Sequence, residues 1–449
     1  MGILATGLLF YGFYQDGLHV ADPAWFARCR GEDVVVVGRM VKSRRDGLFS
    51  AGGLNGWVMY NDPTVRPEDR WIDGRSRDYQ VRAYLEDLPF DSYHAYLSQP
   101  GGQSLLFSAL DRCLPLAGEA KLQWFHGLAA LLSAVTLTLL VLWFLREFGW
   151  CVALFALATM VSSQWLVVLG SSLWWSIWAL YLPMIGAMYF LEKDRRSVQP
   201  RVWECGLLVF ALVFLKCLIN GWEYGTATLL MTMVPFVYEG VRGGRPLRTS
   251  GKRFLVAGLA AVLAVAVSLT LLCIQIAAVK GSVRDGVRHV IYSFQKRTYA
   301  DPKEFPGPFR ASLAAPAVPV VRKYLEGSFV DLERPHKQPR NGSGGPRKVT
   351  YQFLVALFLV ASVVVCLQKR RWAAANRWRG SLALVASTWF SILGPLSWFV
   401  IFKAHSFVHL HLNFIAWQMP FTIFGFAVCG LALRSAFLRA ARPVNSPSP

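Results

Sequence analysis

Apolar residues in this sequence are gathered into long blocks that polar stretches separate. Several blocks reach about 20 residues, the length that a helix needs to cross the hydrocarbon core of a bilayer. The ten blocks are Ile3–Tyr14, Trp124–Leu145, Trp150–Leu169, Leu173–Leu191, Trp203–Ile219, Trp222–Tyr238, Phe254–Val279, Tyr351–Leu367, Ser381–Phe402 and Phe414–Leu433. This pattern predicts an all-α integral membrane protein with about ten transmembrane helices. It excludes a water-soluble enzyme, a disordered chain and a disulfide-stapled mini-protein.

Two long polar stretches divide this array. We expect a short first transmembrane helix in residues 1–14, an external loop with interfacial helices in 15–123, and transmembrane helices 2–7 in 124–279. A second external loop (280–350), transmembrane helices 8–10 (351–433) and a cytoplasmic tail (434–449) follow. A helix of twelve residues covers only about 18 Å of a core about 30 Å thick. The first block is therefore either a short helix or the remainder of one whose true start lies upstream of Met1. Ser104–Leu116 is amphipathic but too short and too charged for a span, which predicts an interfacial helix.

Basic residues predict the orientation of the spans. The chain has 47 Lys and Arg against 27 Asp and Glu, a formal net charge of +20. Many of the basic residues lie in the short connections 193–201, 242–253 and 369–379 and in the tail, and such residues favour the cytoplasm. If ten spans alternate, these segments share one side and both long polar stretches lie on the other, which predicts an N-in/C-in protein. Because topology explains the charge, we expect no nucleic-acid partner.

Composition and cysteine usage add little to this interpretation. Hydrophobic residues make up 54% of the chain and charged residues 16%, whereas soluble proteins carry about 25% charged residues. Of eight cysteines only Cys29 and Cys113 lie in the first external loop, where an oxidising compartment would allow a disulfide. No CxxC or zinc-type spacing, Walker A loop or GxGxxG after a strand occurs, so we predict no cofactor and no nucleotide partner, and the sequence does not support a divalent cation.

The densest polar cluster beside a span is the segment 403–413. Its candidate binding residues are Lys403, His405, His409, His411 and Asn413. His405 and His409 share a face if the segment is helical, whereas His409, His411 and Asn413 share one if it is extended. Lysine and imidazole donors suit phosphate oxygens, so a lipid-phosphate site is one interpretation. A metal site, a proton relay and plain headgroup-level residues are the alternatives, and no acidic metal ligand lies nearby in the sequence.

A hairpin and the two polar stretches supply four further candidate binding residues. Lys216 lies inside an apolar block, where an ionisable group is costly unless it is paired or faces a cavity, and Glu223 is its nearest partner. These two residues form either a structural ion pair or part of a substrate site. Arg45, in the glycine-containing segment 41–54, and Arg288, in the second external loop, are candidates for holding an anion. A solvated turn and simple solubilisation are the alternatives for those two arginines.

Two aspartates follow the first apolar block closely. Asp16 and Asp22 are expected near the membrane surface, and a general base for a lipid-borne substrate has to lie at that depth to reach the acceptor hydroxyl. Asp16 lies in a Gln-Asp-Gly sequence that is typical of a turn. The apolar and proline residues after Asp22 would fix it against the membrane.

This arrangement of spans, loops and acidic residues resembles the GT-C superfamily of polytopic membrane glycosyltransferases. The hairpin 216–224 and the segments YLSQPGGQSLLFSAL and KAHSFVHLHLNFIAW are also similar to poorly characterised bacterial multipass proteins. The resemblance implies transfer of a sugar from a polyprenyl-phosphate donor to an envelope glycan, lipid or protein on the non-cytoplasmic face. Asp22 or Asp16 would be the catalytic base, and external basic residues would hold the donor phosphate. Many members have a paired acidic motif after the first helix, whereas Asp16 and Asp22 are separated.

The resemblance also implies the setting and partners of the protein. These are the bacterial inner membrane, a lipid-linked sugar donor and membrane lipids. The alternative is a lipid or lipid-linked saccharide transporter (a flippase), or a non-catalytic membrane protein of envelope assembly. Transporters usually place polar groups at the midplane between two similar halves. Here the polar candidates cluster at one face and the two halves differ in loop length, which favours the transferase.

Overall fold

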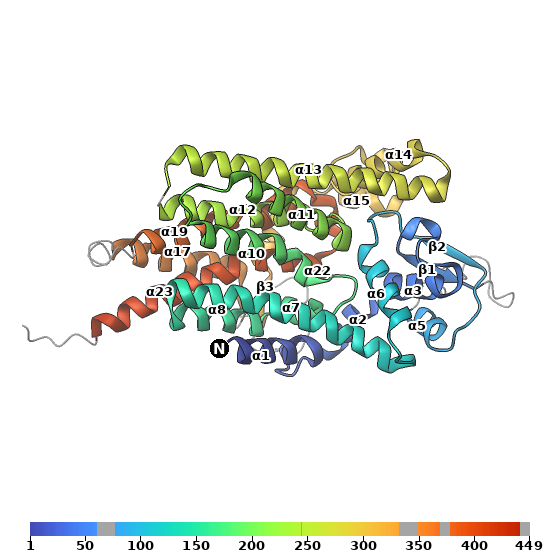
Figure 1. The fold of residues 1–449 in the computed structure, drawn as a ribbon, viewed down its shortest axis with the longest axis horizontal. Helices are drawn as coiled ribbons and strands as arrows, with labels where there is room; N and C mark the ends of the chain where they lie inside the picture. Colours follow the sequence, from blue (N-terminus) through green and yellow to red (C-terminus); the bar gives the residue numbers. More distant parts are fainter. Residues whose placement is uncertain (61–76, 244, 332–347, 369–377, 441–449) are drawn as a thin grey trace, which may run out of the picture.

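The computed structural model describes residues 1–60, 77–243, 245–331, 348–368 and 378–440, and it is 78% helical. Long helices form an elongated bundle, and shorter elements gather at one end of it (Figure 1). The nearly all-α fold confirms the predicted class. The bundle contains α1 (Gly2–Gln15), α7 (Gly118–Phe148), α8 (Trp150–Ser162), α10 (Ile177–Asp194), α11 (Val202–Asn220), α12 (Gly225–Arg242), α13 (Leu247–Lys280), α17 (Tyr351–Leu367), α19 (Trp378–Ser391), α20 (Leu393–Ile401) and α23 (Phe421–Ala440).

The remaining elements are shorter. They are α2 (Pro23–Gly31), α3 (Val34–Asp46), η1 (Ser50–Gly53), β1 (Gly56–Met59), α5 (Arg77–Leu85), β2 (Ser92–Ala95), α6 (Gly102–Cys113), α9 (Gln164–Gly170), α14 (Val283–Gln295), η2 (Pro302–Glu304), α15 (Gly307–Ala314), α16 (Ala317–Glu326), β3 (Ser328–Asp331), β4 (Lys348–Thr350), α21 (Lys403–Val408), α22 (Leu410–Asn413) and η3 (Phe414–Gln418). β1 pairs with β2 and β3 with β4, each antiparallel.

Four helical segments of the described chain are long and apolar enough to cross a membrane. They are α7, α11, α13 and the combined α19–α20 segment, Trp378–Ile401. Two bent pairs raise the number to six if each pair counts as one span: α8 with α9, bent by 65°, and Leu410–Gln418 with Phe421–Ser435, bent by 42°. Helices of this length and apolarity indicate an integral membrane protein.

The remaining expected spans also form helices, but these helices are shorter or less apolar. α1 has 14 residues and α17 has 17. The expected span 173–191 begins only at Ile177, and the span 222–238 begins at Gly225, because the residues before them form turns. The expected span 150–169 is interrupted at Ser163, whose side chain caps α9 by accepting from the backbone N–H of Leu166.

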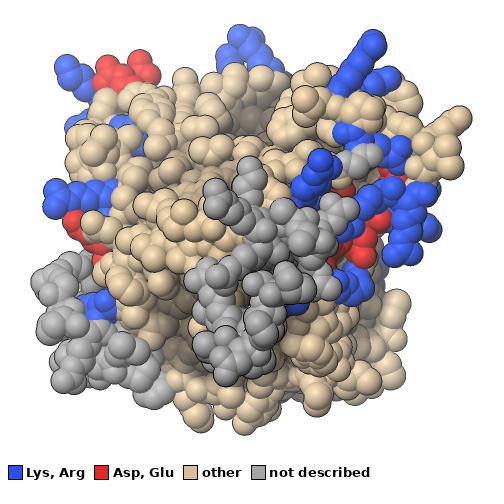
Figure 2. All heavy atoms as spheres, turned by 90° about the vertical axis from the view of Figure 1, so that its left-hand side faces the viewer, with Lys and Arg blue, Asp and Glu red and all other residues tan. Residues whose placement is uncertain are grey.

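The two ends of the bundle carry different elements. The C-terminal ends of α10, α12 and α23 lie on the left in Figure 1, whereas α2, α3, α5, α6, α14 and α15 lie on the right. Figure 2 shows the left-hand end, where Lys and Arg stand around the rim and Asp and Glu are fewer. The basic connection 195–201, which the sequence predicts on the cytoplasmic side, lies at this end.

The first long polar stretch folds into a small unit with its own hydrophobic core. Val36, Met40, Tyr84, Phe107 and Phe125 are all buried in it, and Phe125 comes from the first turns of α7. An ion pair stabilises this unit: the Arg44 guanidinium donates to both carboxylate oxygens of Asp111, at 2.7 and 2.9 Å. The predicted helix in 104–116 is confirmed as α6. Cys29 is buried and Cys113 exposed, and both are free thiols, so the disulfide that the sequence allows is not formed.

Candidate functional site

A polar cavity of about 490 Å³ lies at the end of the bundle that carries the short elements. Its walls come from α2, from the loop before α10, from the α11–α12 turn, and from α14, α15, α21 and α22. The ionisable side chains that line it are Arg28, Glu32, Glu223, Lys296, Arg297, His405, His409 and His411, with Tyr96, Trp174, Trp175 and Asn413 beside them. Acids, bases and aromatic rings thus converge here from segments far apart in the sequence.

The turns that follow α1 determine the position of Glu32 in this cavity. Asp16 ends α1 in the left-handed conformation (φ 49°), and its carboxylate accepts from the backbone N–H groups of Val20 and Ala21. Asp22 then caps α2 by accepting from the N–H of Trp25 at 2.9 Å. α2 ends at Gly31, so Glu32 lies at its junction with α3.

The Glu32 carboxylate lines the polar cavity and accepts one side-chain hydrogen bond. The indole Nε1–H of Trp175 donates to Glu32 Oε2 at 2.9 Å. Burial and, less strongly, the neighbouring Asp33 charge raise the pKa of Glu32 to about 7, against the opposing effect of the Trp175 hydrogen bond. A carboxylate with a pKa near neutral pH is matched to general base catalysis.

The next residue, Asp33, fixes the loop before α10 through hydrogen bonds. Its Oδ1 accepts from the Ser172 hydroxyl at 2.7 Å and from the Trp174 N–H at 2.8 Å, and it is buried. The side-chain amide of Asn220 also donates to the carbonyl of Trp175. These hydrogen bonds fix the loop that carries Trp175 relative to Glu32.

The histidine cluster faces the second carboxylate of the cavity. His405 Nε2 lies 3.4 Å from Glu223 Oε2, and the ring centroids of His405 and His409 are 4.5 Å apart. The His409 and His411 centroids are 6.0 Å apart. Burial, together with the neighbouring His409 and Arg297, lowers the pKa of His405 well below its usual value, so His405 is neutral at pH 7. Neutral imidazoles both donate and accept hydrogen bonds, which suits the hydroxyl groups of a sugar.

Two adjacent cations, Lys296 and Arg297, also line the cavity. Burial and, less strongly, the neighbouring Arg297 lower the pKa of Lys296 to about 8, so Lys296 is mostly protonated at pH 7. The backbone carbonyl of Arg297 accepts from the N–H of His405 at 3.2 Å, which ties α14 to α21. Lys296, Arg297 and the exposed Arg28 give the cavity the positive charge that a phosphate group requires.

An apolar groove of about 380 Å³ adjoins the polar cavity, and Glu223 and Arg297 line both. Its walls come from α11, α12, α13, α14 and α20. Most of its lining is aliphatic or aromatic and includes Val213, Leu229, Val265, Leu269, Leu272, Val290, Ile291, Phe294 and Phe402. A polar and an apolar space thus lie next to each other, with Glu223 and Arg297 in the wall of both.

A third cavity, of about 690 Å³, adjoins the polar one and shares Leu97 and Ser98 with the apolar groove. It shares Tyr96, Lys296 and Phe309 with the polar cavity and is also lined by Trp57 and His94 of the β1–β2 hairpin. Aromatic rings with flanking polar groups are typical of surfaces that bind saccharides.

The structure brings five of the predicted binding residues to the polar cavity: Glu223, His405, His409, His411 and Asn413. Lys216 lines the apolar groove, and its ammonium group donates to the backbone carbonyls of Gly221 (2.9 Å) and Glu223 (2.7 Å). The hydrogen bonds of Lys216 therefore go to the turn, and the Glu223 carboxylate faces His405 in place of Lys216.

Five other predicted residues do not line this cavity. Asp16 and Asp22 accept backbone hydrogen bonds, as described above. Lys403 is buried and donates to the carbonyls of Leu313 (2.6 Å) and Ala315 (2.7 Å), which ties α21 to α15. Arg45 lies against Phe90 and Asp46 in the first folded unit, and Arg288 is exposed beside Asp285, 3.9 Å away.

The sequence pattern did not single out Glu32, Arg28, Trp174 or Trp175, whereas Lys296 and Arg297 belong to the second external loop, whose basic residues are candidates for holding an anion. One signal for Glu32 is present in the sequence: Glu32 and Asp33 are adjacent acids that follow the first helix, whereas Asp16 and Asp22 are separated. Within the described residues no group of three or more His, Cys, Asp and Glu could hold a metal ion.

Comparisons with protein-family models, with curated proteins and with solved structures find no match. The site is therefore interpreted from its own chemistry.

Proposed function

We propose that this protein is a membrane glycosyltransferase that takes a sugar from a polyprenyl-phosphate donor. The observation that carries the proposal is that the polar cavity and the apolar groove adjoin and share Glu223 and Arg297 as lining residues. A polar cavity alone would suit a soluble ligand, and an apolar groove alone would suit a plain lipid. The two together suit an amphiphile whose phosphate lies at the junction.

The proposal includes a topology. All ten helical segments would span the bilayer, with both termini in the cytoplasm and the cavity on the non-cytoplasmic face. The short basic connections support this orientation, because Lys and Arg in short loops favour the cytoplasm. In a bacterium the protein would lie in the inner membrane.

In the proposed reaction Glu32 is the general base, in place of Asp16 and Asp22, whose carboxylates bind backbone N–H groups. The acceptor hydroxyl passes its proton to Glu32 while its oxygen attacks the anomeric carbon of the donor sugar. The bond between that carbon and the phosphate oxygen breaks, and its electron pair stays on the phosphate. Lys296 and Arg297 stabilise the charge that develops on the leaving phosphate.

The remaining lining residues would position the two substrates. The neutral His405 and His409 and the Glu223 carboxylate hydrogen-bond the hydroxyl groups of the donor sugar. The groove binds the first isoprene units of the lipid. The aromatic cavity beside Tyr96 takes the acceptor.

Product formation tests the proposal. Purified protein in lipid nanodiscs is incubated with a panel of radiolabelled polyprenyl-phosphate sugars, and transfer or hydrolysis is measured for the wild type, Glu32→Gln and Asp22→Asn. We expect turnover by the wild type, a loss of at least about 100-fold in Glu32→Gln, and near-normal turnover in Asp22→Asn, because asparagine also caps helices well.

Two outcomes would contradict the proposal. Full activity of Glu32→Gln together with inactive Asp22→Asn would return the base to Asp22. The absence of turnover by the wild type, with movement of the same lipids between leaflets, would make the protein a transporter.

A further inference from the structure

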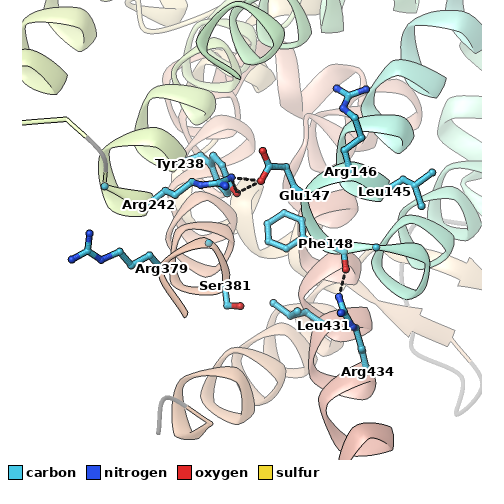
Figure 3. A pocket seen from close by; sticks show the side chains of 13 residues that line it. Leu145, Arg146, Glu147, Phe148, Tyr238, Arg242, Arg379, Ser381, Leu431 and Arg434 are labelled. Carbon is cyan, nitrogen blue, oxygen red and sulfur yellow. Dashed lines mark hydrogen bonds and ion pairs between the residues drawn. The ribbon is translucent and has the colours of Figure 1, made fainter. Parts of the chain in front are cut away.

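A second polar cavity, of about 650 Å³, lies at the opposite end of the bundle from the proposed active site (Figure 3). It opens among the ends of α7, α12, α19 and α23. Four arginines line it, Arg146, Arg242, Arg379 and Arg434, against a single acid, Glu147. In Figure 3, Arg242 and Arg379 lie on one side and Arg146 and Arg434 on the other.

Two of these arginines are neutralised by carboxylates. Arg146 pairs with Glu192, with Nη2 and Oε2 2.9 Å apart. Arg242 pairs with Glu147, which also receives a hydrogen bond from Arg195 at 2.9 Å, and Arg195 in turn pairs with Glu239. Arg195 and Arg242 are therefore balanced by Glu147 and Glu239.

The other two arginines are not balanced. Within the described residues neither Arg379 nor Arg434 has a carboxylate within ion-pair distance; Arg434 donates to the backbone carbonyl of Phe148. That hydrogen bond caps the C-terminal end of α7, where a cation is favourable. The guanidinium of Arg379 lies beside Gly243, which ends α12, and a cation is favourable at that helix end as well. Helix ends thus favour both arginines, but no acid of the described residues neutralises either of them.

Glycines leave room beside both guanidinium groups. A Cβ on Gly243 would lie 3.2 Å from Arg379 Nη1, and a Cβ on Gly149 would lie 3.3 Å from Arg434 Nη1. Both glycines end helices with positive φ (75° and 86°) and line the cavity. The cavity therefore combines open space with two guanidinium groups, one on each side, that no carboxylate of the described residues neutralises.

We propose that this cavity binds the phosphate group of an anionic phospholipid. Guanidinium groups bind phosphate oxygens through paired hydrogen bonds. The cavity lies where apolar helices end, and Leu145 and Leu431 line it, which matches a headgroup above acyl chains. At that level of a cytoplasmic leaflet the abundant anions are lipid phosphates. The proposal does not depend on the glycosyltransferase assignment.

Lipid retention by the full-length protein tests this site. The protein is placed in nanodiscs of phosphatidylcholine alone or mixed equally with phosphatidylglycerol, and bound lipids are counted by native mass spectrometry after gentle release. The variant Arg379→Gln with Arg434→Gln is compared with a matched control, Arg196→Gln with Arg248→Gln. The control removes the same charge from exposed arginines at the same end of the bundle but outside the cavity.

We expect the cavity variant to retain phosphatidylglycerol about tenfold less than the wild type, and the control to retain it normally. Because Arg434 also caps α7, Arg379→Gln alone and Arg434→Lys are measured as well. Arg379→Gln should lower phosphatidylglycerol retention without changing the melting temperature. Arg434→Lys should preserve phosphatidylglycerol retention. Equal losses in the cavity variant and the control would overturn the proposal, since general surface charge would then explain the binding.

A calorimetric titration with inorganic phosphate, in phosphatidylcholine nanodiscs, distinguishes the two sources of a phosphate group. Absence of heat, together with specific phosphatidylglycerol retention, supports the lipid. Saturable binding of free phosphate that the cavity variant abolishes, without specific lipid retention, would overturn the lipid assignment in favour of a soluble phosphate ligand.

Discussion

The indole of Trp175 and the carboxylate of Glu32 form a 2.9 Å hydrogen bond that joins the loop before α10 to the junction of α2 and α3. The two residues are 143 positions apart, so the bond exists only when both segments have reached their final places. The hydrogen bond positions the Glu32 carboxylate, whose pKa is raised, in the cavity that Lys296 and Arg297 also line.

Replacing Glu32 by glutamine should stabilise the protein at alkaline pH. The folded state raises the pKa of Glu32 from 4.5 to about 7. Since the folded state binds this proton more tightly than the unfolded state, the stability of the wild type falls as pH rises from about 4.5 to 7. Glu32→Gln escapes this loss and still accepts from Trp175. We expect it to be up to about 3 kcal/mol more stable at pH 8 and equal at pH 4, measured by thermal unfolding in nanodiscs. A pH-independent difference would contradict the raised pKa.

The rate of sugar transfer should pass through a maximum between pH 7 and 8. Below the Glu32 pKa of about 7 the base is protonated, so kcat/KM should fall tenfold per pH unit. Above the Lys296 pKa of about 8 the ammonium group loses its charge and the donor phosphate binds less tightly. In Lys296→Arg the alkaline limb should disappear, because arginine stays protonated. An unchanged alkaline limb in that variant would remove Lys296 from phosphate binding.

Lys403 and His409 should respond differently to substitution, although the sequence placed them in one cluster. Lys403→Met removes two hydrogen bonds from an ammonium group to the carbonyls of Leu313 and Ala315, so we expect a loss of about 2–4 kcal/mol in stability. The side chain of His409 lines the cavity. We therefore expect His409→Ala to leave the melting temperature within about 2 °C and to lower turnover. Thermal unfolding and product formation are measured on both variants. If Lys403→Met unfolds at the same temperature as the wild type, Lys403 does not have the structural role.

Filling the apolar groove should weaken binding of long-chain donors. Gly225 lines the groove, and a Cβ there would meet only Trp222 Cβ, at 4.0 Å, so Gly225→Leu should fold. We expect KM for a long polyprenyl-phosphate sugar to rise about tenfold or more, with little change for a donor whose lipid is only one or two isoprene units long.

Gly258→Leu is the control for this experiment, because a Cβ on Gly258 of α13 meets nothing within 4 Å and the residue lies outside the groove. If both variants bind both donors as the wild type does, the groove does not hold the lipid.

Residues close to a span were predicted better than residues in the long polar stretches. His405, His409 and His411 are near one another in the chain, so local sequence was enough to group them, and Glu223 follows the Asn220–Gly221 turn directly. The position of Glu32 depends on the left-handed turn at Asp16 and on the helix cap at Asp22. Neither feature produces a periodic pattern in the sequence. The β1–β2 register pairs Gly56 with Ala95, and such a long-range pairing leaves no local signal. Lys403 was misjudged because its partners are backbone carbonyls, which every residue carries.

Helix α14 gives the bilayer a part in the site. Val287, Ile291 and Phe294 are exposed on α14, and Ile291 and Phe294 also line the apolar groove. Exposure of these side chains to water is unfavourable, so lipid against this face of the helix would stabilise it. In the proposed binding site, the bilayer would then form one side of the apolar groove. A detergent that replaces the lipid poorly should therefore have the effect of a point mutation in the groove. It should weaken binding of the donor lipid while the helix bundle remains folded.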